Sequence, residues 1–413
     1  MENVEFSDLM ELAEMISERL DNPITIEDMN HRVIAYSTHG DMTDPVRMQT
    51  IMKRKVPEAV LVRFWKEGVI QALMHTDEPV RIPAIKDVGL DNRAAISIRR
   101  GQEVLGYIWV QEAVRRIEDA DLDVLKWAAR MAMPRMIHRK TRHSQNEEKR
   151  RELFWQLLSK GAMDRREIEK QAADLQVHLP AVMEVLVFEA KCAADIWRNV
   201  QKELEYLLSN LNDFIPFQSL PLWTFDQRQL IVLGGLDKKN EGKIQAISMQ
   251  FIEQLLKRLD QRFSGEKLMI AGYGQPVYDV LQVSRSYQQA LEVIHLKQSL
   301  SDELGHVCGY HQLGVYHMFP QMARLNEQMG YRNEKLERLM EYDRQNNSNL
   351  VETLEAFLDA AGRMNRTVEV LHVHPNTLSY RLKRIGEVGD INLNDPNDRV
   401  TLFLDIKLSK YKP

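Results

Sequence analysis

A group of hydrogen-bonding and basic side chains near the C-terminal end of the chain has the chemistry needed to contact a DNA duplex. The group comprises Asn376, Thr377, Ser379, Tyr380, Arg381, Lys383 and Arg384. Asparagine can form two hydrogen bonds to an adenine edge, and arginine can bond O6 and N7 of guanine. Hydroxyl and ammonium groups suit phosphate oxygens. We therefore predict that these residues bind a double-stranded DNA operator.

The surrounding sequence predicts a helix-turn-helix that would position these side chains. Asn365 is expected to cap a short helix at 366–371, and residues 372–374 then make a tight connection. Pro375 takes the first position of a second helix, where its missing N–H costs nothing. The inward-facing residues of that helix, at i, i+4 and i+7, are Leu378, Leu382 and Ile385. An ordinary helical hairpin with a solvated polar face remains the alternative.

Positive charge is concentrated at this segment. The formal net charge of the whole chain is −5. Residues 363–384 nevertheless carry five basic residues against one acid, Glu369. A small DNA-reading domain needs only local positive charge, so the acidic whole does not exclude it.

Composition predicts a globular cytoplasmic protein of about two to four domains. The chain has 413 residues, of which 44% are hydrophobic and 28% charged. No apolar run is long enough to span a bilayer, so we expect no membrane partner. The acidic N-terminus does not resemble a secretory signal. Two cysteines, Cys192 and Cys308, cannot form a disulfide framework.

Residues 1–118 predict a sensor with a mixed helix and strand layout. An amphipathic helix is expected at 5–20, a strand pair at 23–28 and 33–37, helices across 45–75, and a hairpin at 94–99 and 104–111. An effector pocket is expected between this sheet and its helices. Its possible lining residues are Tyr36, Arg93, Ser97, Arg99 and Trp109, none of which is assigned to the site.

Residues 119–160 predict a helical linker. Apolar residues recur at spacings of three and four, as in a coiled-coil seam: Leu122, Leu125, Ala129, Ala132 and Met136. Pro134 is expected to kink or end the helix. From 139 to 151 the seam positions turn polar. Either a solvated connector or a dimeric signalling helix fits this pattern.

Residues 161–300 predict a β-α-β-β-α-β domain of ferredoxin-like or cyclase-like type. Its elements are expected at 181–190, 193–209, 222–225, 229–233, 243–263, 267–274 and 278–296. The expected hairpin tip at 226–228 lacks the carboxylates and glycine pair that cyclase chemistry needs, since Gly234 and Gly235 lie beyond the second strand. The chain is therefore predicted not to be an enzyme. We expect no metal, because His306, Cys308 and His311 lack a standard zinc spacing.

The C-terminal motifs resemble those of the PucR/CdaR family of bacterial regulators. Residues 373–382, VHPNTLSYRL, are similar to its VHxNTLxYRL signature, and Asp395 to Arg399 resemble its DPxDR opening of the last helix. Residues 350–354 and the pair Tyr342-Asp343 also resemble family elements. The likeness is strong over about 330–410 and weaker over 181–296. The family often has arginine where Pro375 and Ser379 stand, which removes two possible DNA contacts.

This resemblance implies a multidomain α+β protein. It would comprise a GAF-like sensor at 1–118, a linker or dimerisation helix at 119–160, an inactive GGDEF-like domain at 161–300, a helical connector at 301–344 and an all-α helix-turn-helix domain at 345–413. The implied function is that of a metabolite-responsive transcriptional activator of a catabolic operon, without a cofactor. Proline or another amino acid is the expected effector, with purines and sugar acids as alternatives.

The implied partners are the operator, the effector, RNA polymerase if the protein is an activator, and a second copy of the chain in a homodimer or higher oligomer. Two other classes of function remain open at this stage. One is a nucleotide-signalling enzyme built on the central domain, and the other is a scaffold whose terminal helices bind protein.

Overall fold

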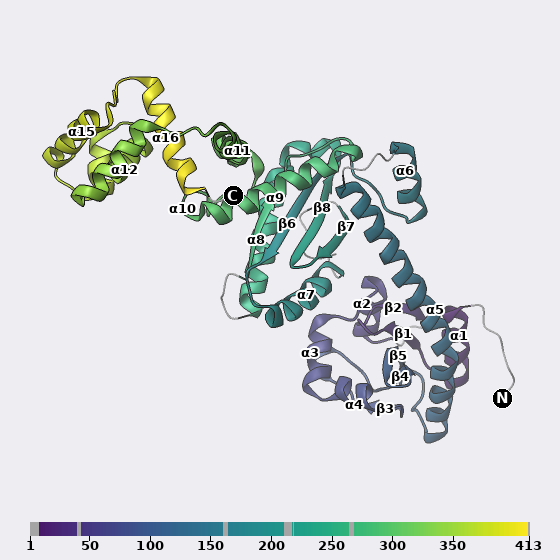
Figure 1. Ribbon diagram of the computed structural model, residues 1–413. Coiled ribbons are helices and arrows are strands. Elements are labelled where there is room, and N and C mark those ends of the chain that lie inside the picture. The colour runs from purple at the N-terminus through teal and green to yellow at the C-terminus, as the bar shows by residue number, and fades with distance from the viewer. Residues whose placement is uncertain are drawn as a thin grey trace. The chain divides into compact units, whose positions relative to one another are not determined.

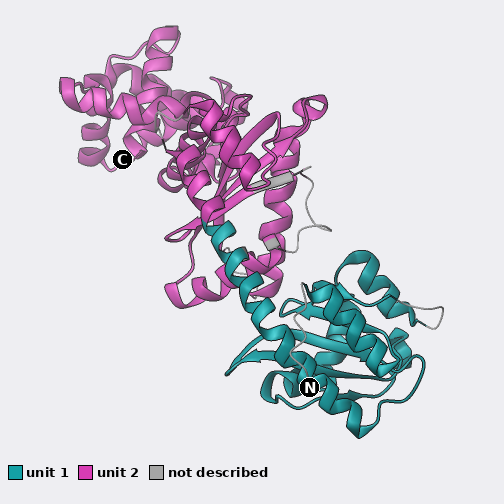
Figure 2. Ribbon diagram, turned by 90° about the vertical axis from the view of Figure 1, so that its right-hand side faces the viewer, with its two compact units in different colours: residues 1–148 teal, residues 149–413 magenta. Residues whose placement is uncertain are grey.

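The structure is a computed structural model that describes residues 8–38, 43–159, 164–209, 217, 219–263 and 268–411. The chain divides into two compact units, residues 1–148 and 149–413 (Figure 2). The division falls within one helix, α5 (Asp119–Leu158). None of the described helices is long and apolar enough to cross a membrane.

Unit 1 is built on a five-stranded antiparallel sheet. Its strands are β1 (Ile24–Asp28), β2 (Val33–Tyr36), β3 (Val80–Ile82), β4 (Arg93–Arg100) and β5 (Glu103–Gln111). The order is β2-β1-β5-β4-β3, so β1 pairs with β5, with Ile26 opposite Ile108. The two predicted hairpins thus belong to one sheet. The short edge strand β3 was not predicted.

Helices cover both faces of this sheet (Figure 1). One face packs against α1 (Leu9–Leu20) and the first half of α5. The other packs against α2 (Pro45–Lys53), α3 (Glu58–Lys66) and α4 (Val69–His75). The Asp8 side chain caps α1 by accepting from the N–H of Met10 at 2.7 Å. The helix therefore begins at Leu9 and not at 5, and residues 5–7 lie outside the described residues.

Helix α5 decides between two outcomes expected at Pro134, a kink or the end of the helix. The helix does not end there but continues to Leu158. Neighbouring residues Ala132 and Met136 are anchored in the core of unit 1, and this burial offsets the roughly 3 kcal/mol that an internal proline costs.

The same packing shows what the apolar stripe of α5 contacts. Leu125, Ala129, Ala132 and Met136 are all buried in the core beside α1 and the sheet. The stripe is therefore part of the chain's own core and not a free coiled-coil seam. Residues 138–142 of the same helix are exposed, as the solvated-connector interpretation expects.

Unit 2 begins with the predicted β-α-β-β-α-β order. Its strands and helices are β6 (Val182–Ala190), α7 (Ala194–Ser209), β7 (Ser219–Asp226), β8 (Gln229–Leu236), α8 (Ile244–Arg262), β9 (Met269–Tyr273) and α9 (Val283–Ser299). The antiparallel sheet has the order β7-β8-β6-β9. One face packs on α7 and α8, and the other on α9, α6 (Arg165–Asp174) and the end of α5 (Figure 1). The multidomain α+β class is confirmed.

Two details of this domain differ from the prediction. Helix α9 begins at Val283, after a single turn at 280–282, and not at 278. The expected strand at 267–274 is β9, and Lys267 lies outside the described residues. Within the expected helical connector, residues 301–332 form α10 (Ser301–Leu304), two short 3-10 turns and α11 (Phe319–Met329).

Five helices complete the chain: α12 (Glu334–Asn346), α13 (Leu350–Asp359), α14 (Met364–Leu371), α15 (Pro375–Gly389) and α16 (Pro396–Lys410). The core shared by α12, α13, α15 and α16 includes Leu339, Leu354, Ile385, Leu402 and Ile406. After α16, Tyr411 packs against α9 to α11, and its hydroxyl lies 2.9 Å from Nε2 of His295. Tyr411 therefore ties the helical bundle to the domain before it.

Candidate nucleic-acid interface

Helices α14 and α15 and the turn between them form the predicted helix-turn-helix. His372 ends α14 in the left-handed conformation, with φ 53°. Nδ1 of His374 then accepts from the N–H of Asn376 at 3.2 Å and caps α15, in which Pro375 is the first residue. The predicted cap at Asn365 is wrong, because α14 already begins at Met364 and Asn365 lies inside it.

The apolar side of α15 faces the bundle as its spacing predicts. Leu378 and Ile385 are fully buried, and Leu382 is half-buried against the same core. Thr367 of α14 is also fully buried, and its hydroxyl donates to the carbonyl of Arg363 at 2.9 Å. These contacts fix which side of α15 faces the solvent.

Five of the seven predicted DNA-binding residues are exposed on α15. They are Asn376, Thr377, Ser379, Tyr380 and Lys383. The Tyr380 side chain stands far out, with 68% of the residue's surface exposed. Four of the five fall in the first two turns of the helix, the part of a recognition helix that enters the major groove.

The remaining two predicted residues, Arg381 and Arg384, are half-buried and bonded within the chain. Arg381 donates to the hydroxyl of Thr353 on α13 at 3.2 Å. Arg384 donates to the hydroxyl of Tyr342 on α12 at 3.2 Å and forms an ion pair with Glu387 at 3.0 Å. They flank the exposed face and do not project from its centre.

Comparison with known proteins agrees with this geometry. Residues 350–408 match the model of the PucR C-terminal helix-turn-helix domain, and residues 160–296 match that of a GGDEF-like domain. The DNA-binding transcriptional activator AdeR of Bacillus subtilis (strain 168) is 36% identical over 403 residues, which is 98% of this chain and 93% of the relative. The chain belongs to the PucR family of transcriptional regulators.

Two further matches complete the comparison. The proline-responsive transcriptional activator PutR of Bacillus subtilis (strain 168) is 28% identical over 414 residues, covering 98% of each chain. The crystal structure of a regulator of polyketide synthase expression from Bifidobacterium adolescentis is 18% identical, covering 64% of this chain and 94% of that one, with a TM-score of 0.25.

The PucR-type motifs outside the recognition helix position it. Asp343 on α12 accepts from the N–H of Leu350 at 2.8 Å and of Val351 at 2.9 Å, and so caps α13. Asp395 caps α16, and Asp398 binds Lys335 of α12 at 2.8 Å. The long-range partners Thr353 and Lys335 could not be predicted from sequence, because such pairings depend on how the helices pack.

The five possible effector-pocket residues in unit 1 do not stay together. Arg93 and Trp109 line a cavity between the sheet and helices α2 and α3. Ser97 and Arg99 instead bond main-chain carbonyls of α4 and its end, Ser97 to Thr76 at 3.0 Å and Arg99 to Met74 at 3.1 Å. Tyr36 does not line the cavity.

The central domain of this PucR-family chain uses its glycine pair for packing. A Cβ at Gly234 would lie 2.6 Å from the Phe217 ring, and one at Gly235 would lie 1.9 Å from Pro180. Close approach of the protein's own side chains therefore explains both glycines. Within the described ranges, no three His, Cys, Asp or Glu side chains are grouped so that they could hold a metal ion.

Proposed function

We propose that this chain is a metabolite-responsive, DNA-binding transcriptional activator of a catabolic operon. The observation that best supports this function is the exposed polar face at the start of α15, which belongs to a helix-turn-helix that matches the PucR type. Full-length similarity to two transcriptional activators supports activation as the sign of control. Proline or another amino acid is the proposed effector, since one of these relatives is proline-responsive.

The proposed DNA contacts divide into two groups. Asn376, Thr377, Ser379, Tyr380 and Lys383 would contact bases or phosphates directly, because all five are exposed. Arg381 and Arg384 would contribute positive charge at the rim while holding α15 to α13 and α12.

The remaining proposals concern organisation and partners. The sensor would occupy 1–118, the linker helix 119–160, the catalytically inactive GGDEF-like domain 161–300, the connector 301–344 and the DNA-binding domain 345–413. Helix-turn-helix proteins commonly bind paired half-sites as dimers, so the protein would act as a homodimer or higher oligomer. It would work in the cytoplasm and, as an activator, would also contact RNA polymerase.

Binding of full-length protein to the DNA upstream of its neighbouring genes, measured across a salt series, tests this function. Specific binding should weaken steeply with salt, because cations released from the phosphates drive association. Asn376→Ala should lower specific affinity by about 5- to 150-fold, since one good bidentate base contact is worth ~1–3 kcal/mol.

The matched control is Asn394→Ala, an exposed asparagine in the loop before α16. It should leave affinity within about twofold of the wild type. Equal affinities for wild type and Asn376→Ala would mean that α15 does not read the operator, and a scaffold function would then be favoured.

A further inference from the structure

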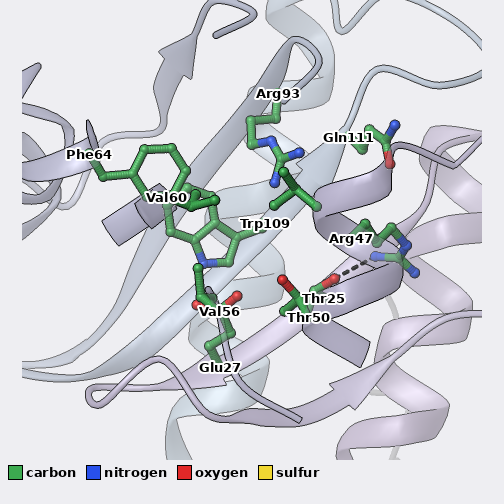
Figure 3. Close-up of a pocket in the computed structure, with 11 residues that line it drawn as sticks. Thr25, Glu27, Arg47, Thr50, Val56, Val60, Phe64, Arg93, Trp109 and Gln111 are labelled. Carbon is green, nitrogen blue, oxygen red and sulfur yellow. Dashed lines mark hydrogen bonds between the residues drawn. The ribbon is translucent and has the colours of Figure 1, made fainter. Parts of the chain in front are cut away.

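The cavity in unit 1 lies between the inner strands of the sheet and two helices. Glu27 of β1, Arg93 of β4 and Trp109 and Gln111 of β5 line it from the sheet, and α2 and α3 close it (Figure 3). The space between a sheet and its helices is usually lined by apolar side chains. This cavity is instead lined in part by buried polar and charged ones, namely Thr25, Glu27, Arg47, Thr50 and Gln111.

Several of these polar atoms lack a hydrogen-bond partner within the part of the chain that the structure describes. They are Nε of Arg47, Oγ1 of Thr50 and Oε1 of Gln111. The exposed fractions of the three residues are 4%, 5% and 3%, so water does not reach these groups freely. Buried polar groups are nearly always paired, because an unpaired one loses its hydration without compensation. Three such atoms around one cavity point to a polar occupant that would pair them, a water molecule in the free protein and a polar ligand in the bound one.

The buried positive charge of Arg47 also favours a polar ligand in this cavity. Among the described residues its guanidinium bonds two neutral oxygens, the Thr25 hydroxyl and the carbonyl of Ser37, the latter at 3.1 Å. No carboxylate among the described residues forms an ion pair with it. Burial, together with the nearby charge of Arg93, lowers the pKa of Arg47 to about 10. An anionic group beside Arg47 would therefore be strongly favoured.

The other basic and acidic groups of the cavity are arranged differently. Arg93 is already paired with Asp44. Glu27 is buried and lies 3.3 Å from Nδ1 of His31, which stacks on Tyr107. Burial raises the pKa of Glu27, and His31 only partly counters that rise. A cationic group on a ligand, lying beside Glu27, would compensate the charge of its carboxylate.

One end of the cavity is apolar. Phe64 and Val60 of α3 lie at this end, whereas Arg47 and Gln111 lie at the other (Figure 3). Phe64 stacks on Trp109, with 5.0 Å between ring centroids. The site therefore offers donors for an anion, acceptors for a cation and a hydrophobic wall.

We propose that this cavity is the effector site and that its ligand is a small free amino or imino acid with an apolar side chain. Arg47 and Thr50 would hold the carboxylate, Glu27 would receive the amine, and Phe64 and Val60 would cover the side chain. This inference rests on the proposed metabolite response. It adds the site at which the metabolite would bind and the chemical class of that metabolite.

The cavity is too small for the proposed ligand, so binding requires a conformational change. Its volume is about 20 Å³, room for about one water molecule and too little for an amino acid. Binding must therefore shift α2 or α3 away from the sheet. A ligand that binds only this expanded state will increase its population, which is how occupancy would be transmitted from the sensor.

Isothermal titration of the full-length protein with each of the twenty common L-amino acids tests the inference. At least one with a small apolar side chain should bind, and its carboxamide derivative should bind at least tenfold more weakly because the carboxylate is lost. Arg47→Gln should abolish binding, and the near-isosteric Thr50→Val should weaken it about tenfold. Near-ultraviolet circular dichroism shows whether each variant is folded.

Arg99→Gln is the matched control for Arg47→Gln, because Arg99 also bonds main-chain carbonyls in unit 1 but does not line the cavity. It should bind the amino acid like the wild type. Binding that survives in both Thr50→Val and Arg47→Gln, or no binding by any amino acid, overturns the inference. Operator binding by the same wild-type sample, measured without amino acid, separates this failure from a failure of the proposed DNA-binding function.

Discussion

The guanidinium group of Arg384 on α15 lies over the aromatic ring of Tyr342 on α12, with its central carbon 4.9 Å from the ring centroid. The Tyr342 hydroxyl accepts a hydrogen bond from Nε of the same arginine, and this bond raises the pKa of Arg384 above its usual value. One side chain thus joins the candidate recognition helix to the helix that caps α13. Arg384 positions the reading face as well as adding charge to it.

Arg384→Ala should therefore affect the packing of α15 more than base recognition. We expect faster amide hydrogen exchange in α12 and α15, because the stacking and hydrogen bonding between the two helices are lost. Operator affinity should fall by less than it does in Asn376→Ala. Hydrogen exchange with mass spectrometry and a DNA titration check the two expectations on the same sample.

Tyr342→Phe is the control for this prediction, since it removes the hydroxyl and keeps the ring. It should give part of the increase in exchange and leave operator affinity within about twofold of the wild type. If Arg384→Ala instead weakens DNA binding as much as Asn376→Ala with no change in exchange, Arg384 is a direct contact.

The sequence predicted the elements of α15 well because local rules determine them. Pro375 at the first helical position and the i, i+4, i+7 spacing of Leu378, Leu382 and Ile385 indicated both the start and the buried side of the helix. The same spacing could not show that Arg381 and Arg384 would be drawn into bonds with Thr353 and Tyr342. Those partners lie on other helices, and their approach depends on tertiary packing.

Helix α5 also shows that a local sequence pattern cannot identify the packing partner of a helix. A stripe with three- and four-residue spacing is expected both for a coiled coil and for a helix packed on its own domain. Leu125 and Ala129 are buried by α1 and the sheet, which no local pattern could distinguish from a partner helix. The cavity was predicted only in part. Its place between the sheet and the helices and its residues Arg93 and Trp109 were expected, but Arg47 and Thr50 on α2 were not recognised as facing β5.

A buried lysine near the end of α16 supports a further prediction. Lys407 is 4% exposed and binds Glu355 at 2.6 Å and Asp359 at 2.9 Å, both on or next to the end of α13. Burial lowers the pKa of Lys407, but these hydrogen bonds outweigh it and hold the pKa above its ordinary value. Lys407→Met should cost about 3 kcal/mol of local stability, the low end for breaking a buried ion pair, because Asp359 loses its cation and Glu355 keeps only the more exposed Lys410.

Lys410→Met is the matched control for Lys407→Met. Lys410 binds the same Glu355 at 2.6 Å but is 45% exposed at its side chain, so its loss should cost less than about 1 kcal/mol. Hydrogen exchange of α13 and α16 across a denaturant series measures both values. Equal costs for the two substitutions would show that burial does not set the strength of this cluster.

Glu184 provides a test of how pH acts on the central domain. It is the third residue of β6, is fully buried, and accepts a hydrogen bond from the Ser248 hydroxyl of α8. Its second carboxyl oxygen has no hydrogen-bond partner among the described residues. Burial raises the pKa of Glu184 to about 8, which the bond from Ser248 only partly counters. The folded domain therefore holds a proton at neutral pH that the unfolded chain has released.

The stability of this domain should fall as pH rises from about 4.5 to about 8. In that interval the folded state binds more protons than the unfolded state, so the slope is negative and reaches at most about 1.4 kcal/mol per pH unit. Glu184→Gln should remove this contribution, because the amide does not titrate, whereas Glu189→Gln on the same strand should keep it. Hydrogen exchange of β6 and α8 at pH 5.5, 6.5 and 7.5, corrected for intrinsic rates, measures the slopes. Parallel slopes in wild type and Glu184→Gln would show that Glu184 is ionised in the fold, with water or a shifted α8 beside it.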